Sequence, residues 1–129
     1  MIGTTIDHVG MVVPDLAAAR PMWERLLGVA GGAPVEVPGL GLTIAFVGSV
    51  ELMQPSGPDS LVGRFLERHG PSLHHVAYRV PDLDATMAEL TASGVEMLDR
   101  TPRMGGGGHR IAFLHPKSTA GFLIELIER

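Results

Sequence analysis

The segment Ile6–Leu16, with the sequence IDHVGMVVPDL, returns later in the chain as Leu73–Leu83, with the sequence LHHVAYRVPDL. His8 and His75 hold the same place in the two copies, 67 residues apart (75 − 8 = 67). Both copies mix apolar and polar residues in a strand-like pattern and then reach Pro-Asp-Leu, which is typical of a half-buried strand followed by a helix N-cap. The chain is therefore predicted to contain a duplicated module with one histidine on each equivalent strand.

A second pair of segments extends the repeat toward the end of each copy. Val50–Met53 matches Ile124–Ile127 at a larger offset of 74 (125 − 51 = 74), because the second copy has a longer loop. Glu51 and Glu125 are then equivalent residues. Two imidazoles and two carboxylates at duplicated positions predict a common divalent-metal site.

Composition limits the size and the partners of the protein. With 129 residues, 45% of them hydrophobic, the chain is long enough for one domain, while each half is near the lower size limit for independent stability. The halves are therefore expected to share a core. A net charge of −4 and the absence of basic runs argue against nucleic acid as a partner. With no cysteine, disulfides and thiolate metal sites are excluded.

Targeting signals are not evident in this sequence. No N-terminal segment has the basic and apolar pattern of a signal peptide, and no apolar run approaches the roughly 20 residues of a membrane span. We expect a cytoplasmic protein without a membrane partner.

The periodicity predicts an α+β fold of two tandem βαβββ modules. Residues 1–54 and 72–129 would form the modules, joined by a linker with a short helix at 55–71, and together they would make a single domain at 1–129. Curved, mainly antiparallel sheets would surround a shared metal-centred cavity. The predicted strands lie at 4–13, 34–37, 42–47, 50–54, 72–80, 96–99, 110–114 and 122–127, and the predicted helices at 16–27, 61–69 and 83–93.

Pro21 lies within the first predicted helix. Because proline suits the first helical position and not the interior, the helix proper is expected to begin near Arg20–Pro21.

A strand histidine or glutamate considered alone is more often an ordinary core or surface residue than a ligand. Recurrence in register favours the predicted ligand set His8, Glu51, His75 and Glu125. Imidazole and carboxylate without sulfur suit a divalent metal such as Co, Mn, Ni, Fe or Zn. Such an ion would leave positions open for a substrate with two neighbouring oxygens and would act as a Lewis acid.

These segments resemble the vicinal oxygen chelate superfamily, which includes the glyoxalase and bleomycin-resistance proteins. Residues 55–129 are more narrowly similar to methylmalonyl-CoA epimerase, through RFLERHG at 64–70, LHHVA at 73–77, FLHPKS at 113–118 and GFLIEL at 121–126. The resemblance implies an isomerase that epimerises methylmalonyl-CoA, or a similar branched acyl-CoA, by 1,1-proton transfer through a metal-stabilised enolate. Its ligand positions fall on His8, Glu51, His75 and Glu125.

One position departs from the resemblance. Some members of the family have a glutamate base in the third strand, where this chain has Ile44. Glu51 and Glu125 are therefore expected to serve as both ligands and catalytic bases, as in the related glyoxalase I enzymes. Alternatively, Glu36 would reach in from a loop.

Further substrate contacts are implied by position. Lys117 and Ser118 lie in a loop that the family uses near substrate, while Ile44, Phe46 and Phe113 would line the cavity. Superfamily members often form homodimers, and we expect one here.

Two other functions remain open at this point. One is a glyoxalase I-type lyase or isomerase acting on a glutathione-like hemithioacetal, which the epimerase-like second half disfavours. The other is a non-catalytic, antibiotic-sequestering protein of the same fold, against which the four intact ligand positions argue.

Overall fold

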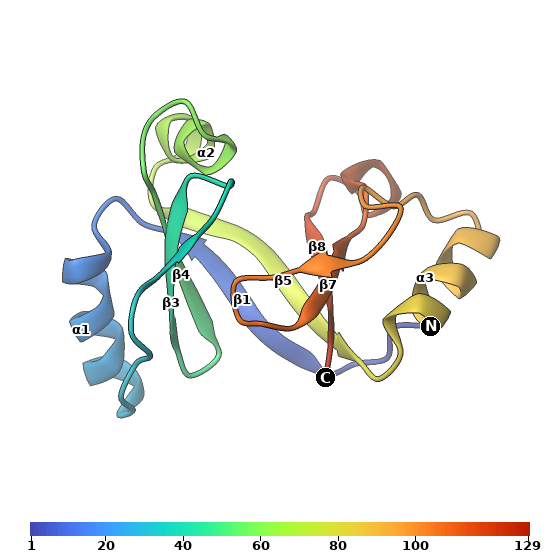
Figure 1. Cartoon of the computed structure of the whole chain (residues 1–129), viewed down its shortest axis with the longest axis horizontal. Helices are drawn as coiled ribbons and strands as arrows, with labels where there is room; N and C mark the ends of the chain where they lie inside the picture. The colour runs from blue at the N-terminus through green and yellow to red at the C-terminus, as the bar shows by residue number, and fades with distance from the viewer. The chain divides into compact units, whose positions relative to one another are not determined.

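The computed structural model describes residues 1–129 and has an α+β fold of strands, three α-helices and one short 3-10 helix (Figure 1). The chain divides into two compact units. Val9–His74 forms the N-terminal unit, whereas Met1–His8 and His75–Arg129 together form the C-terminal unit. The boundaries of these units fall inside two strands, so each of those strands contributes residues to both units.

The N-terminal unit has four strands in the hydrogen-bonded order β2-β3-β4-β1. Its strand β1 runs parallel to β4, while β2–β3 and β3–β4 are antiparallel. Its elements are β1 (Ile6–Val12), which begins in the other unit, α1 (Leu16–Leu27), β2 (Val35–Val37), β3 (Leu42–Val47), β4 (Val50–Pro55) and α2 (Leu61–His69).

The C-terminal unit repeats this arrangement in the order β5-β8-β7-β6. Again the first strand, β5, is parallel to the last, β8, and the remaining pairs are antiparallel. Its elements are β5 (Ser72–Val80), α3 (Leu83–Ala92), β6 (Arg103–Met104), β7 (Arg110–Phe113), the 3-10 helix η1 (Pro116–Ser118) and β8 (Ile124–Glu128).

The register of the strands confirms the repeat seen in the sequence. Glu51 lies opposite Gly10 on β1 and opposite Phe46 on β3. Glu125 lies in the same way opposite Ala77 on β5 and opposite Phe113 on β7. Each unit therefore places its glutamate on the central strand, between the histidine-bearing strand and an aromatic neighbour.

Helices cover the strands of each unit through apolar clusters. In the N-terminal unit, α1 packs against β3 and β4, with Leu16 and Leu52 at the centre of that cluster. A separate cluster packs Val62 of α2 on Val12 and Ile44. In the C-terminal unit, α3 covers β7 and β8 through a cluster of Val80, Leu83, Met87, Leu90, Ala112, Leu114 and Leu126.

The prediction that helix α1 begins near Pro21 was wrong, because α1 is continuous from Leu16 with Pro21 in its interior. The first turn is held by tertiary contacts. Leu16 is buried, its N–H donates to Gln54 Oε1 at 2.6 Å, and the Asp15 side chain caps Ala18 N. These contacts offset the backbone hydrogen bond that proline cannot donate.

The strand predicted at 96–99 was also misplaced. In that segment Met97 forms an isolated bridge to Leu114, and the regular strand is β6 at Arg103–Met104. The Asp99 carboxylate accepts the backbone N–H of Phe113 at 2.8 Å. The Asp99 side chain therefore accepts the backbone N–H of Phe113 that a carbonyl of a paired strand would otherwise accept.

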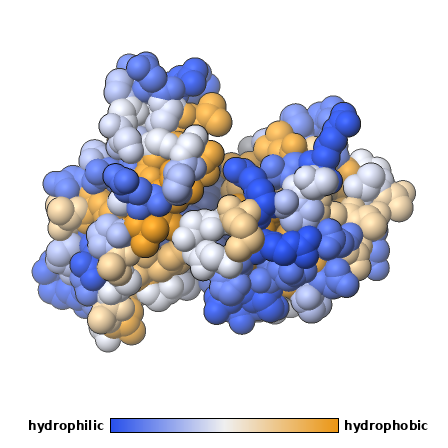
Figure 2. Space-filling model, viewed as in Figure 1, coloured by the Kyte–Doolittle hydropathy of each residue, from blue (hydrophilic) through white to orange (hydrophobic).

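Apolar residues also reach the surface of both units, where hydrophobic patches interrupt the hydrophilic surface (Figure 2). Leu26 and Leu61 are well exposed in the N-terminal unit, as are Met104 and Phe122 in the C-terminal unit. None of the helices is both long and apolar enough to span a bilayer.

Replacing Gly63 by alanine is expected to destabilise the fold by about 1–3 kcal/mol, the usual cost of overpacking. A Cβ at Gly63 would collide with the backbone carbonyl oxygen of Gly57 and press on Ser60 Oγ. The clash should exceed the roughly 1 kcal/mol that alanine contributes through helix propensity. Urea unfolding of Gly63→Ala measures the change. Gly57→Ala is the matched control, since a Cβ there meets no atom within 4 Å. A Gly63→Ala protein as stable as the wild type would contradict this packing.

Candidate metal centre

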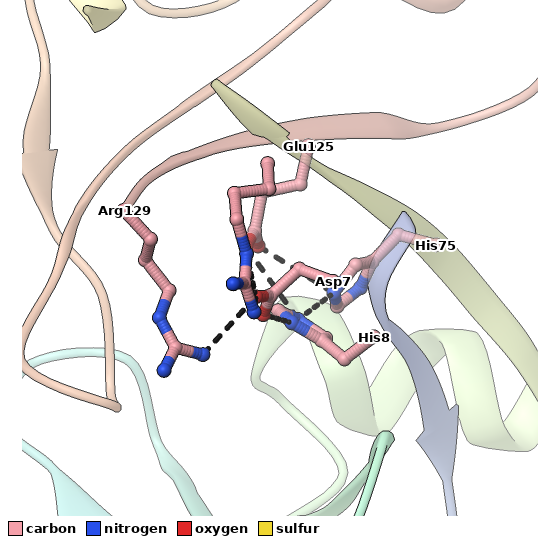
Figure 3. Close-up of polar contacts among 6 residues, drawn as sticks. Asp7, His8, His75, Glu125 and Arg129 are labelled. Atoms are coloured by element: carbon pink, nitrogen blue, oxygen red, sulfur yellow. Dashed lines mark hydrogen bonds and ion pairs between the residues drawn. The ribbon is translucent and has the colours of Figure 1, made fainter. Parts of the chain in front are cut away.

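Two histidines of the C-terminal unit point toward one another from neighbouring strands. His8 lies on β1 and His75 on β5, and both are buried, at 2% and 4% exposure. Their Nε2 atoms are 3.3 Å apart, and the rings meet edge to face (Figure 3). Each histidine shares its face of the strand with buried residues, Gly10 and Val12 on β1 and Ala77 on β5, so strand parity turns both imidazoles toward the interior.

Glu125 completes a three-residue cluster with the two histidines. Its Oε1 lies 3.5 Å from His8 Nε2, and its Oε2 lies 3.4 Å from His75 Nε2. The parallel pairing of β5 with β8 sets this geometry, because Ala77 lies opposite Glu125 and His75 is two residues earlier on the same face. A carboxylate that is only 5% exposed is costly to bury without a compensating positive charge.

The spacing of these three side chains fits a divalent ion. Nitrogen and oxygen donors bound about 2.0–2.2 Å from one ion lie roughly 3 to 3.5 Å from each other. The observed separations of 3.3, 3.4 and 3.5 Å fall in that range. Since imidazole and carboxylate are also suitable donor types, His8, His75 and Glu125 can hold a metal.

Asp7 is a buried carboxylate next to His8 that sequence reasoning passed over. Its Oδ2 accepts a hydrogen bond from His8 Nδ1 at 2.8 Å, and its Oδ1 accepts from Arg79 and Arg129 (Figure 3). Burial alone would raise the pKa of Asp7, but the hydrogen bonds from His8 and Arg79 and the charge of Arg129 lower the pKa below its ordinary value. The repeat did not reveal this residue, because its equivalent is His74. The available signal was an acidic residue directly before the predicted ligand His8, in a strand whose other residues are apolar or glycine.

Phe113 borders the cluster on one side. Its ring meets the His75 ring edge to face, with 5.6 Å between centroids. Arg103 Cζ lies over the Phe113 ring, 5.4 Å from the ring centroid. Phe113 therefore lies beside one of the two histidines, and its contact with substrate stays a prediction.

Glu51, Phe46 and Ile44 belong to the N-terminal unit. Glu51 is buried on β4 at 8% exposure, directly opposite the half-buried Phe46. Ile44 is 3% exposed and packs in the apolar cluster under α2 with Val12. The position where the resemblance implies a glutamate base is therefore a core position here, and contact of Ile44 with substrate stays a prediction.

Lys117 and Ser118 lie on η1 and are exposed. The Lys117 ammonium pairs with Glu96 and lowers the pKa of that carboxyl. Ser118 Oγ accepts the backbone N–H of Glu96 at 2.9 Å. Both residues therefore tie the η1 loop to the segment after α3, and their predicted contact with substrate stays a prediction.

Comparison with known proteins places this geometry in a family. Residues 7–113 match the family described as the glyoxalase/bleomycin resistance protein/dioxygenase superfamily. The chain belongs to this superfamily. Its α+β fold, the duplicated modules and the histidine-glutamate cluster are consistent with that membership and with the resemblance seen in the sequence.

Within the glyoxalase/bleomycin resistance protein/dioxygenase superfamily, the chain is similar to acyl-CoA epimerases over nearly its whole length. It is 37% identical to the ethylmalonyl-CoA/methylmalonyl-CoA epimerase of Cereibacter sphaeroides, covering 98% of each chain. The crystal structure of methylmalonyl-CoA epimerase from Mycobacterium tuberculosis superposes with a TM-score of 0.90 at 34% identity, covering 99% of this chain and 92% of that one.

A third relative has a bound ligand. A variant of the Streptomyces coelicolor methylmalonyl-CoA epimerase in complex with 2-nitronate-propionyl-CoA superposes with a TM-score of 0.88 at 33% identity, covering 97% of this chain and 94% of that one. Together these similarities confirm the predicted α+β fold and support the prediction of an isomerase of the epimerase kind.

Proposed function

We propose that the protein epimerises methylmalonyl-CoA, or a similar branched acyl-CoA, by a metal-dependent 1,1-proton transfer. The observation that carries this proposal is the buried cluster of His8, His75 and Glu125, in which the imidazole Nε2 atoms are 3.3 Å apart and each lies 3.4–3.5 Å from one oxygen of Glu125. Full-length similarity to acyl-CoA epimerases supports the choice of substrate.

Glu51 is the proposed fourth ligand. In the C-terminal unit, Glu125 lies opposite Ala77, two residues after His75. In the N-terminal unit, Glu51 lies opposite Gly10, and the continuous strand β1 carries His8 two residues before Gly10. Glu51 therefore has the same register relative to the strand of His8 as Glu125 has relative to the strand of His75.

A divalent ion held by these residues would supply Lewis acidity that stabilises negative charge developing on the substrate. The side chains of the protein must then transfer the proton. Epimerisation removes the α-proton from one face of the substrate and returns a proton to the other, so it needs a base and an acid on opposite faces.

Glu125 and Glu51 are the proposed acid-base pair. One carboxylate accepts the α-proton while the other, in its protonated form, donates a proton to the opposite face of the planar enolate. After one turnover the proton has changed from one glutamate to the other, and exchange with water restores the starting state. Ile44 has no ionisable group, and Glu36 is exposed on β2. These two facts favour the two buried glutamates as the bases.

Phe46, Phe113 and Ile44 are proposed to provide apolar contacts for the acyl group, and Lys117 and Ser118 polar ones. The expected homodimer and cytoplasmic location also stay predictions. Leu26 and Leu27 of α1 are exposed and provide apolar surface that a partner copy would cover. Sedimentation analysis tests whether the protein is a homodimer.

In heavy water, the wild-type protein with Mn²⁺ or Co²⁺ is expected to replace the α-hydrogen of methylmalonyl-CoA by deuterium, because the bases exchange their proton with solvent. Mass spectrometry after quenching with a chelator measures the exchange. If no branched malonyl-CoA exchanges while a glutathione hemithioacetal is converted, the glyoxalase-type alternative is favoured and the epimerase proposal fails.

Glu125→Gln is expected to lower the exchange rate by at least about 100-fold, the usual contribution of a general acid or base. Glu51→Gln is expected to lower turnover while the metal remains bound, since an amide oxygen still coordinates metal but does not accept a proton at neutral pH. Glu67→Gln, on the exposed face of α2, is the control and should leave both values unchanged. Wild-type turnover in Glu51→Gln would place the second base elsewhere.

Metal binding is expected to raise the thermal stability of chelator-treated protein. At a free ion concentration about 100 times Kd, a ligand that binds only the native state contributes about 2.7 kcal/mol. Calorimetric scans with and without Co²⁺ measure the shift in Tm. The shift should be lost in His8→Ala and His75→Ala. Equal shifts in the wild type and in both variants would show that the ion binds at another place.

A further inference from the structure

Asp7 is held by four hydrogen bonds and lies directly behind one of the proposed ligands. Its side chain is only 4% exposed. Oδ2 faces His8 Nδ1 at 2.8 Å. Oδ1 accepts from Arg79 Nη2 at 2.8 Å and Nε at 3.1 Å, and from Arg129 Nη1 at 3.1 Å (Figure 3). The two arginines thus neutralise the carboxylate and leave Oδ2 for the imidazole.

This contact determines which nitrogen of His8 carries the proton. A neutral imidazole has one N–H and one lone pair. Because ionised Asp7 has only acceptor oxygens, the proton of His8 lies on Nδ1. The lone pair then lies on Nε2, which faces His75 Nε2 at 3.3 Å and Glu125 Oε1 at 3.5 Å. A metal ligand needs its lone pair in that direction.

The same contacts also connect the three strands that carry the cluster. β1 contributes His8 and Asp7, and β5 contributes His75 and, four residues later, Arg79. Glu125 lies on β8, and Arg129 follows the end of that strand. Each of these three strands, or the residue directly after it, therefore supplies one donor of the cluster and one member of the Asp7 contact. We call Asp7, Arg79 and Arg129 the carboxylate clamp.

We infer that Asp7 is a positioning residue that fixes the Nδ1–H tautomer of His8 and, through the carboxylate clamp, the spacing of His8, His75 and Glu125. The consequence for metal affinity rests on the proposed function, whereas the tautomer is a property of the metal-free protein. Carboxylates behind ligating histidines typically contribute about 10- to 100-fold to metal affinity.

Asp7→Asn is the sharpest test, because it preserves shape and reverses one hydrogen bond. Arg79 and Arg129 both donate toward Oδ1, so they retain the amide oxygen of the asparagine on their side. The amide nitrogen then faces His8 and donates to Nδ1. His8 is expected to change to the Nε2–H tautomer, which directs a proton into the cluster and removes the lone pair.

The tautomer is measured by ¹H–¹⁵N correlation spectroscopy of the imidazole rings in metal-free protein at mildly alkaline pH. Wild type is expected to show His8 as Nδ1–H, Asp7→Asn as Nε2–H, and Asp7→Ala as a mixture. Competition with a chelator then measures Co²⁺ affinity, which should fall about 10- to 100-fold in both variants.

Asp84→Asn is the matched control, because Asp84 also accepts from an arginine, Arg110 Nη2 at 2.8 Å, in the same unit but is exposed. Both readouts should equal those of the wild type. A wild-type tautomer in Asp7→Asn would overturn the inference, even if the protein binds metal. Conversely, a changed tautomer in a protein that binds no metal at all would uphold the positioning role and refute the proposed metal function.

Discussion

A buried carboxyl group beside two imidazoles is the constraint on which the site depends. Glu125 is almost inaccessible to water, and its two oxygens face His8 and His75. In a low-dielectric interior such a carboxylate requires a positive partner, and apolar packing alone does not supply one. Under the proposed function, a divalent ion would satisfy this carboxylate and the two imidazoles at once, which would account for three polar side chains in an otherwise hydrophobic region.

Parallel strand pairing sets the place of the glutamate in each unit. The first strand of each repeat lies beside the last one, although the helix and hairpin between them separate the two in sequence. In each pair, the glutamate lies opposite the residue that comes two positions after the histidine on the first strand. The strand that carries the glutamate is buried on both faces. A one-residue slip in either pair would turn the glutamate to the opposite face. The hydrophobic residues around Glu51 and Glu125 therefore protect the register as well as the core.

Asp7 contacts the side of His8 that faces away from His75 and Glu125. Arg79 and Arg129 are partly exposed, so their charges are solvated while their side chains reach a buried carboxylate. That carboxylate orients the imidazole of His8. The two arginines at the surface thus act on the orientation of His8 through the hydrogen bonds of Asp7. The carboxylate of Asp7 is buried, but it is paired with positive charge.

The sequence by itself determined the repeat, the α+β class, the superfamily and the equivalence of the two histidines and two glutamates, because strand parity and duplication are local properties of the chain. Its helix and strand boundaries were correct where capping and periodicity agreed, as in Leu61–His69. Tertiary structure alone decided the parallel pairing of β1 with β4 and of β5 with β8, the helical first turn before Pro21, and the interruption of the ladder by Asp99. It also decided the role of Asp7, since the arginines that hold its charge lie 72 and 122 residues away in sequence. Contacts between residues so far apart in the sequence depend on which strands pair and in which register. The local sequence pattern of one strand does not determine that pairing.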